Sequence, residues 1–119
     1  MIFGRKHTVL SESAVKKLME MSTEFKFKHN EMLHGFQYVA MFPNRYGISI
    51  IKHDYSYGNE DDLFEIAVLD GYDGKYVNIC YDTPITDDVI GSLKEEEVLK
   101  IAKDISELQQ VLKEDYKND

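Results

Sequence analysis

The stretch "FQYVAMFPNRYGISIIKH", residues 36–53, decides the fold because it holds two apolar runs around one turn. Pro43 fixes its own φ angle and Asn44 tolerates left-handed geometry, so this pair marks a reversal of the chain. The run at 48–51 is rich in β-branched isoleucine, which favours a sheet. The stretch therefore predicts two antiparallel strands joined by a short turn.

A second hairpin is predicted downstream. The apolar runs 63–70 and 76–82 flank Asp73-Gly74, a dipeptide typical of tight hairpin turns. Run 63–70 carries apolar residues on both of its faces, which indicates a central strand covered on both sides. The polar loop 54–62 joins the two hairpins.

An amphipathic helix is predicted within residues 11–30. Ser11 and Ser13 are good N-caps, and an apolar stripe follows at spacings of three and four residues. The pattern weakens near its end, where Phe25 and Phe27 alternate with lysines as in a strand.

A long C-terminal helix is predicted over residues 93–115. Ser92 and Glu95 have the spacing of a capping box, and three glutamates occupy the first turn, where the helix dipole favours negative charge. We expect its apolar stripe to pack on the sheet; a helix pair in a dimer is the alternative. The stripe consists of Val98, Ile101, Ile105, Leu108 and Leu112.

The fold class is therefore α+β, in one domain spanning residues 1–119. We expect an antiparallel sheet of about four strands, made of two hairpins, with an N-terminal helix and a long C-terminal helix packed on it. Residues 1–35 would be a helical extension, 36–92 the β-rich part and 93–115 the last helix.

Charge is unevenly distributed along this chain of net charge −8. Residues 1–59 carry 8 Lys/Arg against 5 Asp/Glu, whereas residues 60–119 carry 6 against 17. Such an acidic half repels nucleic acids, so we expect no nucleic-acid partner. The favoured interpretation of the excess charge is solubility, and attraction of a basic protein surface is the alternative. No apolar run approaches a membrane span, and the N-terminus lacks the apolar core of a secretory signal, so we expect a cytoplasmic protein without membrane partners.

Three aspartates, Asp82, Asp87 and Asp88, gather in "CYDTPITDDVIGSL", residues 80–93. Their spacing does not match a calcium loop, and an acid–base or two-metal site would need a partner that is not visible nearby. The favoured interpretation is structural: Asp82 ends a strand, and Thr86 or Asp87 caps a short turn closed by Gly91. We expect no bound metal or cofactor.

The common catalytic patterns do not occur. The chain has no Gly-rich phosphate loop, no HExxH and no GxSxG. Its single cysteine, Cys80, is interpreted as a small buried hydrophobe, which leaves no disulfide or Cys-based zinc site. The histidines at 7, 29, 34 and 53 are expected in exposed loops. We therefore predict a protein that is not an enzyme.

Tyr55 and Tyr57 lie in the predicted polar loop beside Gly58. Exposed tyrosines commonly anchor protein interfaces. The alternative is that both rings fold back over the sheet edge. The candidate protein-binding surface comprises Tyr55, Tyr57, Asp61, Asp62, Asp82, Asp87 and Asp88.

Three segments, "FPNRYGISII", "SYGNEDDLFEIAVLD" and "CYDTPITDDVIGSLKEEEV", resemble a group of small proteins encoded by bacteriophages and prophages. That group shows an "NGYG-S-V" strand, an "SYG…LYELAVL" segment and a "YDTPITDDVIG-L-EEEV" close. The resemblance covers residues 42–101 and departs at Arg45, where Gly is common, and at Phe64, where Tyr is common. It implies a phage origin and a sheet-plus-helix domain; the group has no settled biochemical function.

The leading functional hypothesis is a small non-enzymatic phage protein that binds a host or phage protein, as an inhibitor or adaptor in host takeover or anti-defence. One alternative is a structural or assembly factor that acts as a homodimer through the C-terminal helix. A second is a metal-dependent module that uses Asp82, Asp87 and Asp88. In each case the site of action would be the host bacterial cytoplasm.

Overall fold

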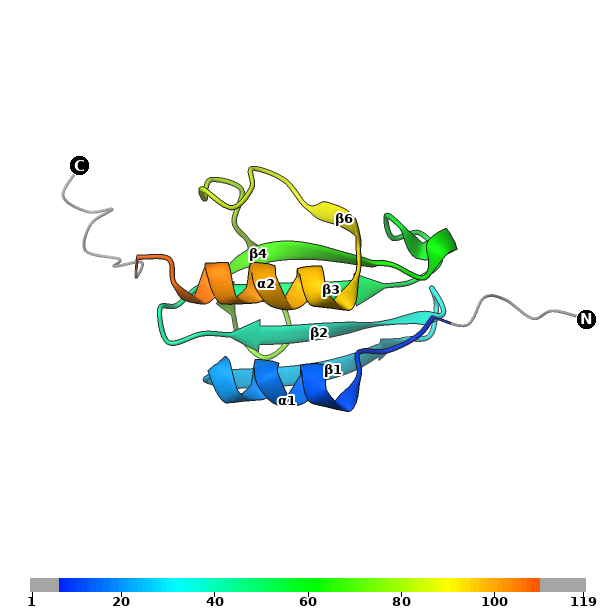
Figure 1. Cartoon of the computed structure of the whole chain (residues 1–119), viewed down its shortest axis with the longest axis horizontal. Helices are drawn as coiled ribbons and strands as arrows, with labels where there is room; N and C mark the ends of the chain where they lie inside the picture. The colour runs from blue at the N-terminus through cyan, green and yellow to red at the C-terminus, as the bar shows by residue number, and fades with distance from the viewer. Residues whose placement is uncertain (1–6, 110–119) are drawn as a thin grey trace, which may run out of the picture.

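The computed structural model describes residues 7–109 and places two helices over one antiparallel sheet of six strands (Figure 1). Helix α1 lies over β1, and α2 lies over β3 and β4, so both helices cover the same face of the sheet. The elements, in chain order, are α1 (Glu12–Met21), β1 (Glu24–Asn30), β2 (Gly35–Met41), β3 (Gly47–Lys52), the 3-10 turn η1 (Asn59–Asp61), β4 (Phe64–Tyr72), β5 (Val77–Ile79), β6 (Ile90–Leu93) and α2 (Glu95–Ser106).

Strand β4 organises the sheet because it pairs with three other strands. One side of β4 faces β3, and the order from the far edge is β1-β2-β3-β4. The other side is shared: β6 pairs with the N-terminal half of β4, around Phe64 and Ile66, and β5 pairs with the C-terminal half, from Leu69 to Tyr72. The segment between β5 and β6 therefore returns along the same edge.

The main core fills the space between the helices and the sheet. Ile48 and Ile50 of β3 face it together with Ile66 and Val68 of β4, because residues two apart in a strand share a face. The helices contribute fully buried side chains from their inner stripes, which are Ala14, Leu18, Val98, Ala102 and Ile105.

A smaller apolar cluster lies on the opposite, helix-free face of the sheet. It joins Val39, Met41 and Leu69 with the β4–β5 hairpin, which folds over this face after a bulge in β4. The Lys28 ammonium donates a hydrogen bond of 3.1 Å to the Lys75 carbonyl in that hairpin. The prediction that the 63–70 strand is covered on both sides is therefore correct.

The turn between β2 and β3 also makes contact with the C-terminal end of helix α2. The Asn44 side-chain amide donates to the carbonyl oxygens of Ile105, at 2.7 Å, and Leu108, at 3.0 Å. Ile105 belongs to the last turn of α2, and its carbonyl also accepts from the Leu108 N–H, whereas Leu108 lies just beyond the end of the helix. One amide thus connects the β2–β3 hairpin to the end of α2.

The predicted number of about four strands is too low, and β1 is the first reason. The sequence predicts residues 24–30 as the weakening end of the N-terminal helix, but α1 ends at Met21 and the chain continues as a strand. The alternation of Phe25 and Phe27 with lysines has the period of a strand, and seven consecutive pairs with β2 stabilise it. The stretch 1–35 is therefore not simply a helical extension.

Strand β6 is the second reason why the predicted number of strands is too low. Ser92 does not cap a helix: it sits in β6 with a positive φ of 57°, and its N–H donates to the Tyr57 carbonyl at 3.1 Å. Glu95 does not reach back to Ser92 either, because its carboxylate accepts hydrogen bonds from the N–H and hydroxyl of Ser11, at 2.7 and 2.8 Å. Helix α2 begins instead at Glu95, and the Lys94 N–H donates to the Glu97 carboxylate.

The C-terminal helix packs on the sheet of its own chain, as predicted. Ile105 is fully buried, while Ile101 and Leu108 are only partly buried against the core. The helix ends at Ser106, earlier than the predicted 115, and Leu112 lies outside the described residues.

Ile105→Ala should lower the free energy of unfolding by about 2–4 kcal/mol, because it opens a cavity in a filled core. Ile101→Ala should cost less, since part of that side chain already faces solvent. Urea denaturation of both variants measures the difference. Equal losses would show that the two positions share one environment, contrary to the structure.

Candidate protein-binding surface

Residues 53–62, which make up most of the connection between β3 and β4, are here called the tyrosine loop. It projects beyond one end of the sheet, beside β6 (Figure 1). The side chains of Tyr55 and Tyr57 are 78 % and 66 % exposed, so neither ring folds back over the sheet edge. Of the two interpretations of these tyrosines, the exposed one is correct.

The inner side of the tyrosine loop is held by Ser56, which is buried. Its hydroxyl accepts a hydrogen bond from the His53 N–H and donates one to the His53 carbonyl, both at 3.0 Å. Its carbonyl accepts from the Asn59 N–H at 3.1 Å. A buried hydroxyl with partners on both sides keeps the turn in one conformation.

The tyrosine loop also lies directly against β6, and two glycines permit this approach. A Cβ atom on Gly91 would lie 2.3 Å from the Tyr57 Cβ, and one on Gly58, whose φ is +91°, would lie 2.6 Å from the Ser92 Cα. The Tyr57 N–H donates to the Glu65 carboxylate at 2.9 Å. These contacts hold the backbone that carries the tyrosines against β6 and β4.

The two ends of the tyrosine loop meet through a buried lysine. Lys52 is 1 % exposed, and its ammonium donates to the carbonyls of Thr8 and Asp62, both at 2.8 Å, and to the Asp62 carboxylate at 3.0 Å. The same nitrogen lies 3.8 Å from the centre of the Phe64 ring. Lys52, which precedes the tyrosine loop, is thus bonded to Asp62, the last residue of the loop.

Asp62 is part of this anchor rather than a free surface charge. Partial burial alone would raise the pKa of Asp62, but hydrogen bonds from Thr8 and Lys52 outweigh it and lower the pKa to about 2. The carboxylate therefore stays ionised opposite the Lys52 ammonium across the physiological pH range.

Asp54 connects the tyrosine loop to two other segments. One carboxylate oxygen is 2.8 Å from His7 Nε2 and the other is 2.7 Å from His34 Nδ1. These hydrogen bonds, first that from His34 and then that from His7, lower the pKa of Asp54. The expectation of exposed histidines is wrong for His7, whose side chain is buried, and correct for His34.

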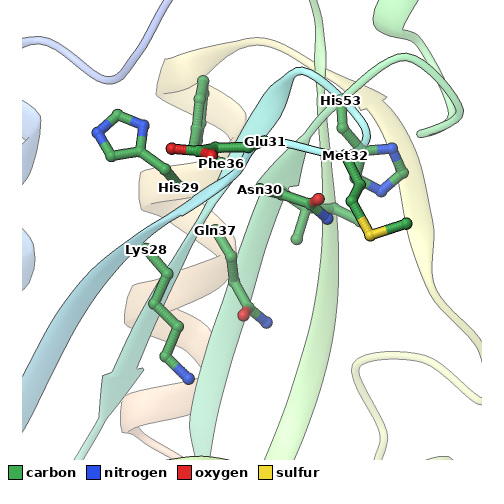
Figure 2. A pocket seen from close by; sticks show the side chains of 9 residues that line it. Lys28, His29, Asn30, Glu31, Met32, Phe36, Gln37 and His53 are labelled. Atoms are coloured by element: carbon green, nitrogen blue, oxygen red, sulfur yellow. The ribbon is translucent and has the colours of Figure 1, made fainter.

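A cavity of about 520 Å³ borders the tyrosine loop on the helix-free face of the sheet. His53, the first residue of the loop, lines it together with Met32 from the β1–β2 turn (Figure 2). Lys28 and Gln37 project from β1 and β2 on the same side, whereas His29 points away. Polar side chains of β1 and β2 therefore lie next to the start of the tyrosine loop.

The seven predicted surface residues do not form one patch. Asp61 is exposed on the tyrosine loop, but Asp82, Asp87 and Asp88 are exposed on the separate segment between β5 and β6 (Figure 1). The tyrosines and Asp61 therefore define one surface, and the three aspartates define a separate acidic loop.

The acidic loop is organised by its threonines and by Cys80. The Thr83 hydroxyl accepts from the Ile85 N–H at 3.2 Å, and the Thr86 hydroxyl accepts from the Asp88 N–H at 3.0 Å. This agrees with the structural interpretation, except that Gly91 belongs to β6 and closes no short turn.

Cys80 is buried, as predicted, and its thiol donates to the Asp82 carboxylate at 2.9 Å. Burial and this hydrogen bond raise the pKa of the Cys80 thiol to about 11. The thiol is therefore protonated at neutral pH and is a poor nucleophile.

Within residues 7–109, no group of three or more His, Cys, Asp or Glu side chains is arranged to hold a metal ion. Neither helix in this part of the chain is long and apolar enough to cross a membrane.

The chain is a small acidic α+β protein whose clearest surface feature is a rigid loop with two exposed tyrosines. No family model matches it, and no curated protein or solved structure matches it either. The geometry of the loop is accordingly the main guide to function.

Asp62→Ala should lower the free energy of unfolding by about 1–3 kcal/mol, because the buried Lys52 ammonium loses its carboxylate partner. Urea denaturation at pH 7 measures the loss. Asp61→Ala removes an exposed carboxylate one residue away and is the matched control, expected to change stability little. Equal effects of the two substitutions would contradict the anchoring role of Asp62.

The stability difference between the natural protein and Asp62→Ala should depend on pH. The folded-state pKa of about 2 lies below the ordinary value of 3.8, so the Asp62 contribution is complete above 3.8 and is lost as the pH falls toward 2. Urea denaturation at several pH values should therefore show the two proteins converging in acid. A difference that stays constant between pH 5 and pH 2 would contradict the ionised pair.

Proposed function

We propose that this protein acts without catalysis, by binding another protein through its tyrosine loop. The observation that carries the proposal is the combination of exposed Tyr55 and Tyr57 side chains with a backbone held by Ser56 and β6. A tyrosine ring buries a large area on binding and loses only two side-chain torsions. A loop that is already rigid pays little further conformational entropy.

The charge around the loop supports a basic partner surface. Glu60 and Asp61 are exposed beside the tyrosines, and residues 60–119 carry the excess of acidic side chains. Opposite charge across an interface acts mainly on the rate of association. The rings would then supply the contact that holds the complex together.

The buried groups near the loop support a binding role rather than a chemical one. Lys52 is enclosed by Thr8, Asp62 and the Phe64 ring, so its ammonium is out of reach of a substrate. The Asp54 carboxylate is occupied by His7 and His34. Both sets of contacts fix the backbone beneath the exposed tyrosines.

The resemblance to phage-encoded proteins suggests where such a partner would be found. A host protein, or another phage protein, in the cytoplasm of an infected bacterium is the natural candidate. Binding to it would make this chain an inhibitor or adaptor in host takeover or anti-defence.

A capture experiment from host-cell extract tests the proposal. The natural protein should retain a partner that the double variant Tyr55→Ala/Tyr57→Ala loses, since removal of two anchors costs most of the contact energy. Tyr76→Ala/Tyr81→Ala is the matched control, because these tyrosines are 66 % and 52 % exposed elsewhere on the surface. Retention of the partner by the loop variant, or its loss from the control, would refute the role of the loop.

The association rate with the captured partner should fall as salt is raised. Exposed charges are screened over roughly 8 Å at physiological ionic strength, so steering by the acidic surface weakens above it. Surface plasmon resonance at low and high salt measures the rate. A rate that does not change with salt would show that the acidic residues serve only as a solvated surface.

A further inference from the structure

Strand β1 forms an edge of the sheet. It pairs with β2 through seven consecutive residue pairs, Glu24 opposite Met41 to Asn30 opposite Gly35, and within residues 7–109 no strand lies on its other side. It contains no proline and its register has no bulge. Such a regular edge is a template for pairing with another chain.

An aromatic side chain is left partly uncovered at this edge. The Phe27 ring is 38 % exposed, although its inner side packs on Tyr38, at 4.7 Å between ring centres, and on Phe36, at 5.9 Å. The aromatic cluster of the sheet therefore continues to the border of the molecule. An aromatic side chain of another chain placed next to Phe27 would extend this aromatic cluster.

Helix α1 adds an apolar flank to the same border. One flank of α1, with Met21, faces Leu99 of α2 across a shared groove. The other flank carries Val15 and Met19, which is 55 % exposed, and lines a cavity of about 500 Å³ together with Leu10. Figure 1 shows α1 and β1 together at the lower border of the molecule.

The sequence of β1 is complementary to itself in an antiparallel pair. With Lys26 opposite its counterpart, Glu24 faces Lys28 of the second copy and Phe25 faces Phe27 of the second copy, each pair occurring twice. The two Lys26 side chains repel each other, and each lies diagonal to one Glu24 and one Lys28 of the other copy, whose opposite charges offset each other. Shifting the axis to Phe27 would place Lys26 opposite Lys28 and lose both opposite-charge pairs.

We propose that two copies of this chain pair antiparallel along β1 and form one continuous sheet across a twofold axis. An axis perpendicular to the sheet keeps the helix-bearing faces on the same side. The two α1 helices then lie next to each other and cover Val15 and Met19. This interface differs from a dimer made by α2, whose stripe packs on its own sheet.

The dimer and the proposed binding function are independent. The tyrosine loop joins β3 to β4, two strands removed from the β1 edge, so pairing leaves Tyr55 and Tyr57 exposed. Loss of one property would leave the other measurable.

Light scattering coupled to size-exclusion chromatography tests the pairing on the full chain. The natural protein should show twice the chain mass of 13.8 kDa. Glu24→Lys places a lysine opposite Lys28, and Lys28→Glu places a glutamate opposite Glu24, so each variant alone should run at the mass of one chain. An equimolar mixture should recover the dimer, because each altered strand then meets its complement.

The mixture separates a lost interface from a lost fold. Lys28→Glu also removes the hydrogen bond to the Lys75 carbonyl, and a misfolded variant would not pair when mixed. Glu96→Lys and Lys103→Glu make the same charge changes on the exposed surface of α2 and should remain dimeric. A monomeric natural protein, dimeric single variants, monomeric control variants or a mixture that stays monomeric would each overturn the proposal.

Discussion

The burial of one ammonium group, that of Lys52, is the constraint on which the rest of the structure depends. A charge removed from water needs partners on every side, and here they come from the N-terminal segment, at Thr8, and from the end of the tyrosine loop, at Asp62. A buried ion pair adds little net stability, but an arrangement that leaves the charge unpaired is strongly disfavoured. Lys52 therefore selects the arrangement in which these segments converge at one end of the sheet.

The same end of the molecule carries the candidate site, which explains why the exposed tyrosines rest on a rigid base. Lys52 and Asp54 flank the start of the loop, and each is held by residues distant in the sequence. Two glycines then allow β6 to lie against the loop backbone. Lys52, Asp54 and the two glycines thus position the backbone of the tyrosine loop, and this backbone carries the exposed tyrosines.

Local patterns predicted the parts of the fold that local interactions decide. Both hairpins follow from their turn residues, whereas the polar loop left open whether the Tyr55 and Tyr57 rings are exposed or fold back over the sheet edge. The start of α2 could not be predicted, because Ser92 and Glu95 bond to Tyr57 and Ser11 instead of to each other. Burial of Lys52 did leave a signal, since it shares a strand face with Ile48 and Ile50, whereas the burial of His7 left none.

The bonds of the N-terminal segment bear on how the chain folds as it is synthesised. Ser11 and Glu95 are 84 positions apart, and Thr8 and Asp62 are 54 apart. Thr8 and Ser11 can therefore reach these partners only after residues far downstream have left the ribosome. Closing such long loops costs entropy before any contact repays it, which slows folding. Until Glu95 leaves the ribosome, the Ser11 N–H and hydroxyl lack their carboxylate partner, so the start of α1 can bond to α2 only after residue 95 has been made.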